Sequence, residues 1–171
     1  MRAPKSQTKP IRQETRPYAE LLVRLCLESN PEALGLVRAT VQRATEVVRF
    51  PEPESRAIVR SVDEALANVI RHAYQNRPGM PIEVVCRRLF DDREKANLRG
   101  LEVDLEDSGI AVNPKKLHGR ALEDIRPGGL GLHFMKQSMD VVEFRRKNGK
   151  NLLRMVKYLA PSRPEEKPKG E

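Results

Sequence analysis

Residues 64–74 read E-A-L-A-N-V-I-R-H-A-Y and lie inside a longer helical pattern. Glu64, Asn68 and His72 recur at steps of four, so all three project from one side of a helix. An apolar stripe runs beside this row and consists of Ile58, Val62, Ala65, Leu66, Val69, Ile70 and Ala73. A carboxylate and an amide oxygen one turn apart can orient a water molecule and coordinate a hard metal ion. Taken alone, the row favours a solvated helix flank over a functional site, because such rows are common on surface helices.

The chain of 171 residues fits a single globular domain, which we place at residues 18–159. Hydrophobic residues make up 39% of the chain and charged residues 33%, whereas aromatic residues make up only 4%. Aliphatic side chains must therefore fill the core. The scarcity of aromatic residues leaves little to stack on nucleic acid.

The net charge of +8 is concentrated partly at the N-terminus, where residues 1–17 contain five basic residues and one acidic residue. We expect residues 1–17 to form a basic, disordered tail and residues 160–171 to form a second tail. Contact between the basic tail and an acidic partner surface is a second interpretation. Direct nucleic-acid binding ranks third, because no recognised nucleic-acid motif accompanies the charge.

The two cysteines and the hydropathy pattern indicate a cytoplasmic protein. Cys26 and Cys86 lie in apolar, strand-like runs without metal-ligand or redox spacing, which predicts two buried thiols in a reducing cytosol. No apolar run approaches the length that crosses a membrane, and the N-terminus lacks the apolar core of a signal peptide.

The order of expected elements predicts the fold class. Strands are expected at 18–27, 81–90, 98–106, 141–145 and 151–159, and helices at 30–48, 54–75 and 129–139. This order favours an α/β (α+β) two-layer sandwich, with a mixed, mainly antiparallel sheet and the helices on one face. Residues 107–128 form an unusually long connection, and long connections inside compact domains are usually functional.

Two short motifs flank the long connection. At its start, Asp107-Ser108-Gly109 ends a strand with a carboxylate that can accept a hydrogen bond from an amino group and a glycine that permits close approach to a flat ring. At its end, residues 126–132 (R-P-G-G-L-G-L) precede a helix, and backbone N–H groups at a helix N-terminus attract phosphate. This second motif is neither a P-loop nor a Rossmann fingerprint. The basic residues between the motifs fit either a lid over a polyphosphate or a solvated loop.

Taken together, these parts resemble the GHKL superfamily of ATP-binding proteins, which share the Bergerat fold. Within it, the chain is most similar to the small anti-sigma-factor serine/threonine kinases of bacteria. Residues 64–74 match the N box of the family, 107–114 (D-S-G-I-A-V-N-P) its first glycine box, and 128–142 (G-G-L-G-L-H-F-M-K-Q-S-M-D-V-V) its second. The resemblance covers about residues 20–159, and the combination of boxes is more specific than any one of them.

The resemblance implies a role for each matching residue. Glu64 is the general base that activates the attacking hydroxyl, and Asn68 is a ligand of Mg²⁺. Asp107 reads the amine of adenine, with Gly109 beneath the ring. Gly129 and Gly131 donate backbone N–H groups to the phosphates of ATP or ADP, with Leu130 between them in the same ATP-binding segment. For His72, a structural hydrogen bond is preferred over a contact with phosphate.

The resemblance also implies an activity and partners, with one alternative. The expected protein phosphorylates a serine or threonine of an anti-sigma-factor antagonist, sequesters a sigma factor and forms a homodimer, without direct contact to nucleic acid or membrane. The alternative is a non-catalytic nucleotide-binding module that switches a partner protein. Where the last strand pair of the family holds Gly-Thr, this chain has Gly149-Lys150-Asn151-Leu152, which favours the alternative, whereas Glu64 favours the kinase.

Overall fold

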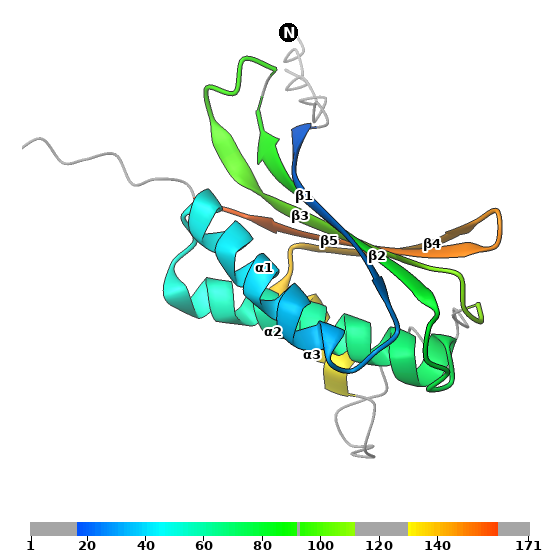
Figure 1. Ribbon diagram of the computed structural model, residues 1–171. Helices are drawn as coiled ribbons and strands as arrows, with labels where there is room; N and C mark the ends of the chain where they lie inside the picture. The colour runs from blue at the N-terminus through cyan, green and yellow to red at the C-terminus, as the bar shows by residue number, and fades with distance from the viewer. Residues whose placement is uncertain (1–16, 92, 112–129, 161–171) are drawn as a thin grey trace, which may run out of the picture.

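The computed structural model describes residues 17–91, 93–111 and 130–160. In these ranges, five strands form one sheet in the order β1-β2-β3-β5-β4, and every neighbouring pair is antiparallel. The helices α1, α2 and α3 all cover one face of this sheet (Figure 1). The predicted two-layer α/β sandwich is therefore confirmed. Most of the long connection (residues 112–128) and most of both expected tails lie outside the described residues.

The elements follow the predicted order along the chain. They are β1 (Tyr18–Glu28), α1 (Ala33–Val48), α2 (Glu52–Asn68), a π-helical turn η1 (Val69–Ala73), β2 (Pro81–Phe90), β3 (Leu98–Asp107), α3 (Leu130–Ser138), β4 (Val141–Lys147) and β5 (Lys150–Tyr158). Among the described residues, no helix is both long and apolar enough to cross a membrane.

Aliphatic side chains fill the layer between the helices and the sheet, as the composition predicts. The apolar stripe of α2 and η1 is buried there, and Val37, Val41 and Val48 of α1 are completely buried beside it. The sheet contributes alternate residues of β2, β3 and β5, because successive side chains of a strand point to opposite faces. These contacts hold α2 against the sheet and so fix the direction of its polar side.

The helix boundaries differ from those predicted, and local chemistry explains the differences. α1 begins at Ala33 rather than at Asn30, because the Asn30 side chain accepts a hydrogen bond from the Glu32 N–H at 3.0 Å and closes a separate turn. α2 begins at Glu52 rather than at residue 54, because a proline is tolerated in the first turn of a helix. The single helix expected over 54–75 is instead an α-helix that ends in a π-helical turn.

The hairpin turn at residues 147–150 forms as predicted. Asn148 and Gly149 both have positive φ angles, 51° and 80°, which is the conformation that favours asparagine followed by glycine. This turn joins β4 to β5 and sets their register, with Arg146 opposite Asn151.

One of the two cysteine predictions is wrong. Cys86 is buried, and burial raises the pKa of its thiol to about 12. Cys26 is exposed, because it lies on the edge strand β1 and faces the side of the sheet that the helices leave uncovered. In the apolar run around Cys26, the residues that alternate with it, such as Leu25 and Leu27, are partly buried against the core.

Candidate functional site

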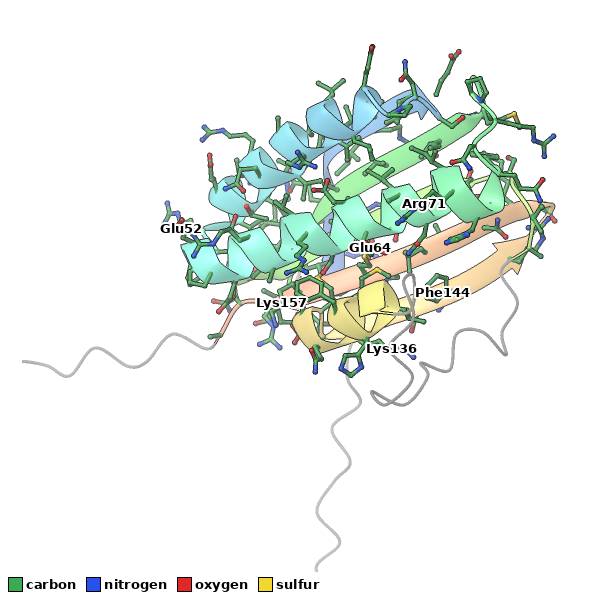
Figure 2. All side chains as sticks on the ribbon, turned by 90° about the horizontal axis from the view of Figure 1, so that it is seen from below. Glu52, Glu64, Arg71, Lys136, Phe144 and Lys157 are labelled. Carbon is green, nitrogen blue, oxygen red and sulfur yellow. The ribbon has the colours of Figure 1, made fainter. Side chains whose placement is uncertain are left out.

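The polar side of α2 places Glu64 and Asn68 at the edge of the core. Both residues are half-buried, one turn apart on the same helix. Figure 2 shows Glu64 on the side of α2 that faces α3. The two residues predicted as base and metal ligand therefore lie on one helix, beside the helix that carries the second glycine motif.

The side chain of Glu64 packs directly against the backbone of Gly131 in the first turn of α3. A β-carbon on Gly131 would overlap the Glu64 side chain, so only glycine permits this approach. The N-terminus of a helix attracts negative charge, and the Glu64 carboxylate lies beside it. The structure thus brings together two predicted site residues from distant parts of the sequence. Gly129 lies outside the described residues, and Leu130 is the first residue of α3.

Arg71 is a site residue that the sequence analysis missed. Its guanidinium Nη2 lies 3.6 Å from Oε1 of Glu64, and the two side chains are 50% and 31% exposed. An ion pair this exposed adds little to stability. The spacing of seven residues, or two helical turns, is the one signal in the sequence that could have revealed this pair.

The row of polar residues at steps of four ends at Asn68, because the π-helical turn η1 follows. Within it the N–H of Tyr74 bonds to the carbonyl of Val69, five residues earlier, so the spacing of an ordinary helix does not continue to His72. The side chain of His72 is exposed and makes no hydrogen bond to any described residue. The structural hydrogen bond expected for His72 is therefore absent from this part of the chain.

The end of η1 is hydrogen-bonded to the turn that contains Asp107 and Gly109. The N–H of Ile110 donates to the carbonyl of Ala73 at 2.9 Å, and the N–H of Ser108 donates to the buried hydroxyl of Tyr74 at 2.8 Å. A β-carbon on Gly109 would overlap the backbone of Ala73. Glycine is therefore required at position 109 because the turn packs closely against the helix.

Asp107 is the most deeply buried polar member of the predicted site, with 5% of its surface exposed. Its Oδ1 accepts hydrogen bonds of 2.8 Å from both the N–H of Gly109 and the side-chain amide of Asn151. Burial raises the pKa of Asp107, and these two hydrogen bonds and the charge of Arg146 oppose that rise. Oδ2 accepts no hydrogen bond from the described residues, so it is the oxygen left for a ligand.

An open pocket of about 310 Å³ lies between α2 and α3, on the side of Glu64 away from Asn68. It is lined by Arg60, Glu64, Gly131, His133, Phe134 and Gln137. The guanidinium of Arg60 lies 4.3 Å from the ring centre of Phe134, a cation–π contact between the two helices. Because Glu64 lines this pocket, a second molecule that occupies the pocket would lie beside the Glu64 side chain.

The donor atoms of the site suit a nucleotide with Mg²⁺. No cluster of three or more acidic, histidine or cysteine residues able to hold a metal occurs in the described part of the chain. Mg²⁺ in nucleotide sites is typically held by one or two protein oxygens together with phosphates and waters. Asn68, with Glu64 one turn away, supplies oxygens of this kind, so the residues present fit a metal shared with a phosphate chain.

The sequence profile of the histidine kinase-like ATPase domain matches residues 27–157, which include every described site residue. The chain belongs to this family. The match spans the helix, the turn and the second glycine motif that the sequence analysis combined. It confirms the resemblance to GHKL proteins.

Proteins with similar sequences include two protein kinases. The serine-protein kinase RsbW of Bacillus pumilus is 27% identical over 147 residues, which cover 81% of this chain and 86% of RsbW. The serine/threonine-protein kinase BtrW of Bordetella bronchiseptica is 31% identical over 103 residues, which cover 58% of this chain and 67% of BtrW. Both relatives are named as protein kinases that act on serine or on serine and threonine.

A solved structure supports the fold. A chain of the SiaB–SiaC complex from Pseudomonas aeruginosa superposes with a TM-score of 0.51 and covers 81% of this chain and 91% of its own length. Its sequence identity is 12%, so the likeness concerns the fold alone.

Proposed function

We propose that the protein is an ATP-dependent serine/threonine protein kinase that phosphorylates an anti-sigma-factor antagonist and also sequesters a sigma factor. The observation that carries this proposal is the position of Glu64, whose carboxylate lies between the N-terminus of α3 and the open pocket beside Arg60. A general base for phosphoryl transfer needs a phosphate on one side and an acceptor hydroxyl on the other. The similarity to RsbW and BtrW supports a protein as the acceptor.

The order of residues along α2 and η1 supports a direction for the bound nucleotide. Ala73 contacts the Asp107–Ile110 turn, where the adenine would bind. Asn68 follows toward the N-terminus of the helix, and Glu64 lies about 6 Å further along the axis, at 1.5 Å per residue. The pocket beside Arg60 begins one more turn along. The phosphates would thus run toward Glu64, and the acceptor would approach from the pocket.

The chemistry of this arrangement is an in-line phosphoryl transfer. The acceptor hydroxyl gives its proton to the Glu64 carboxylate, its oxygen bonds to the γ-phosphorus, and the bond from that phosphorus to the bridging oxygen of ADP breaks. Asn68 would hold Mg²⁺, which neutralises phosphate charge when bound. Gly131 leaves room for Glu64 beside the N-terminus of α3, where phosphate charge is favoured.

The second candidate is a nucleotide-binding module that switches a partner without phosphoryl transfer. The guanidinium of Arg71 lies 3.6 Å from the Glu64 carboxylate, where it competes with an acceptor hydroxyl for the same oxygen. Asn151 also occupies the strand pair in which the kinases of the family carry threonine. These two features favour the module, whereas the access to Glu64 from the pocket favours the kinase.

A phosphoryl-transfer assay separates the two candidates. The protein is incubated with γ-labelled ATP, Mg²⁺ and a candidate antagonist, next to Glu64→Gln and Glu52→Gln variants. Glu52 is a matched control, because it lies at the other end of α2, exposed and paired with Arg56 (Figure 2). Label that Glu64→Gln abolishes and Glu52→Gln preserves supports the kinase. ADP binding without transfer supports the module.

The proposed kinase acts in the cytoplasm as a homodimer and contacts neither nucleic acid nor membrane directly. The resemblance to the anti-sigma-factor kinases supports the dimer and the sigma-factor partner. Light scattering during size-exclusion chromatography measures the oligomeric state, and a monomer at all concentrations would contradict the dimer.

A further inference from the structure

Asn151 lies at the meeting point of three strands beside the predicted adenine site. It is the second residue of β5, where it pairs with Asp107 of β3 on one side and with Arg146 of β4 on the other. Only 6% of its surface is exposed. Its amide nitrogen donates to Oδ1 of Asp107 at 2.8 Å, to the carbonyl of Ile110 at 3.1 Å and, at a longer 3.4 Å, to the carbonyl of Gly109.

Arg146 fixes which way the amide of Asn151 faces. Its Nη1 donates to Oδ1 of Asn151 and also, at 3.1 Å, to the carbonyl of Gly109. A guanidinium only donates hydrogen bonds, and an ionised carboxylate only accepts them. The amide oxygen must therefore face Arg146, and the amide nitrogen must face Asp107. The chemistry of the two neighbours leaves Asn151 a single orientation.

The N–H groups of residues 108–110 and the carbonyls of Gly109 and Ile110 are all hydrogen-bonded. On the helix side, the hydroxyl of Tyr74 accepts a hydrogen bond from the N–H of Ser108, and the carbonyl of Ala73 accepts one from the N–H of Ile110. Asn151 and Arg146 hold the carbonyls of Gly109 and Ile110 from the strand side. A binding surface that is already held in place loses less entropy when a ligand binds.

The charge state of Asp107 depends on the same contacts. Burial raises the pKa of Asp107, whereas the hydrogen bond from Asn151 lowers it. The other titratable groups that act on it are Arg146, which favours the ionised form, Glu106, which opposes it, and the neighbouring phenol of Tyr74. Asn151 thus favours an ionised Asp107 whose Oδ1 is already occupied.

We propose that Asn151, oriented by Arg146, is a positioning residue of the nucleotide site that presents Oδ2 of Asp107 to the exocyclic amine of a purine. The inference rests on the proposed nucleotide binding. In this proposal, the carboxamide of Asn151 and the guanidinium of Arg146 support the carboxylate of Asp107, which reads the base. Asn151 and Arg146 act through Asp107 and the turn, without touching the phosphates.

The test is the pH dependence of ADP binding by Asn151→Asp, a variant of the same shape. In the wild type, affinity falls toward acid pH, because Asp107 becomes protonated and can no longer accept the purine amine. In Asn151→Asp, two carboxylates face each other at alkaline pH and repel, so affinity at pH 9 falls by about tenfold or more. The paired carboxyls share a proton as the pH falls, which restores a donor to Asp107 and raises affinity toward the wild-type value. The two proteins thus respond to pH with opposite signs.

Two further variants complete the experiment. Arg146→Met frees the amide to rotate, and we expect ADP affinity to fall severalfold. Arg145→Met is the matched control, because Arg145 precedes Arg146 on β4, faces the opposite side of the sheet and pairs with Glu143. It should bind ADP as the wild type does, and circular dichroism confirms that each variant is folded.

The result that overturns the inference differs from the result that overturns nucleotide binding. If folded Asn151→Asp binds ADP like the wild type from pH 5 to pH 9, or stays weak down to pH 5, Asn151 does not act through Asp107. If the wild type binds no ADP, the proposed function fails. In that case the carboxyl ¹³C signal of Asp107 still tests, without ligand, whether Asn151 acts on Asp107. Asn151→Leu should raise the pKa of Asp107 and Arg145→Met should not, and an unchanged pKa in Asn151→Leu contradicts the inference.

Discussion

The hydroxyl of Tyr74 accepts a hydrogen bond of 2.8 Å from the backbone N–H of Ser108 and donates one to the carbonyl of Pro81. Tyr74 is completely buried directly after the π-helical turn, so one phenol joins the end of the site helix, the first residue of β2 and the turn that carries Asp107. The helix that supplies Glu64 and Asn68 is therefore coupled to the turn proposed to read the base.

Replacing Tyr74 with phenylalanine tests this coupling. The ring still fills the core, but the Ser108 N–H and the Pro81 carbonyl lose their partner. We expect the free energy of unfolding to fall by about 1–3 kcal/mol. ADP affinity should fall with it, because the turn is less firmly held. Urea denaturation and calorimetry measure the two effects. Tyr158→Phe is the control, and an equal loss of stability in both variants would contradict the proposed role of the Tyr74 hydroxyl.

Alanine at Gly109 should separate close packing from backbone freedom. The new methyl group would meet the rigid backbone of Ala73, so we expect a loss of about 1–3 kcal/mol in stability. At Gly35, in the first turn of α1, a β-carbon meets nothing within 4 Å. Gly35→Ala should therefore raise stability by up to about 1 kcal/mol through helix propensity. Thermal denaturation of both variants checks the two opposite signs, and a neutral Gly109→Ala would show that the turn can shift away from the helix.

Gly131→Ala should reduce phosphoryl transfer more than it affects folding. Its β-carbon meets the flexible end of Glu64, which can move aside, and alanine is favoured in a helix. We expect stability within about 1 kcal/mol of the wild type. Transfer from ATP to the antagonist should fall by about tenfold or more, since a small displacement of a base is costly. Single-turnover transfer and a melting curve are the measurements. Normal transfer would show that Glu64 is not held against α3 when it acts.

The two thiols should react at very different rates. Cys26 is exposed on the edge strand, whereas Cys86 is buried with its pKa raised to about 12. Since the thiolate is the reactive form, an alkylating reagent at pH 8 should modify Cys26 in the native protein and Cys86 only after unfolding. Mass spectrometry of peptides after a timed reaction identifies the modified residue. Equal labelling of both cysteines in the folded protein would contradict the described position of Cys86.

The fold was predictable because its signals are local and periodic. The apolar stripe of residues 58–73 predicted the buried side of α2, and the Asn148-Gly149 turn predicted the last hairpin. The exposure of Cys26 was not predictable in this way. Alternation in an edge strand shows that one side is buried, but it does not show which side the helices cover.

The candidate site was predictable only in part, because its contacts depend on how distant elements pack. Motif order predicted Glu64, Asn68 and Asp107 as site residues. The structure places Glu64 and Asn68 on α2 and Asp107 at the end of β3, in the turn that contacts the end of η1. The sequence analysis cited Asn151 only within the stretch that lacks the threonine of the family. Its contact with Asp107 could not be predicted, because it follows from strand register rather than from any local pattern. The π-helical turn was not predicted either, because the helical pattern assumes the same residue spacing throughout.

Calorimetric titration with ADP and Mg²⁺ tests the central claim most directly, with Asp107→Asn beside the wild type and Glu106→Gln as the control. Glu106 neighbours Asp107 on β3 and is paired with Lys150. Because burial raises the pKa of Asp107, its ionised form costs stability at neutral pH, so the neutral asparagine should leave the fold at least as stable. The account predicts that the wild type and Glu106→Gln bind ADP equally and that Asp107→Asn binds about 10- to 100-fold more weakly. A wild type that binds no ADP, or a folded Asp107→Asn that binds it equally well, would contradict the account.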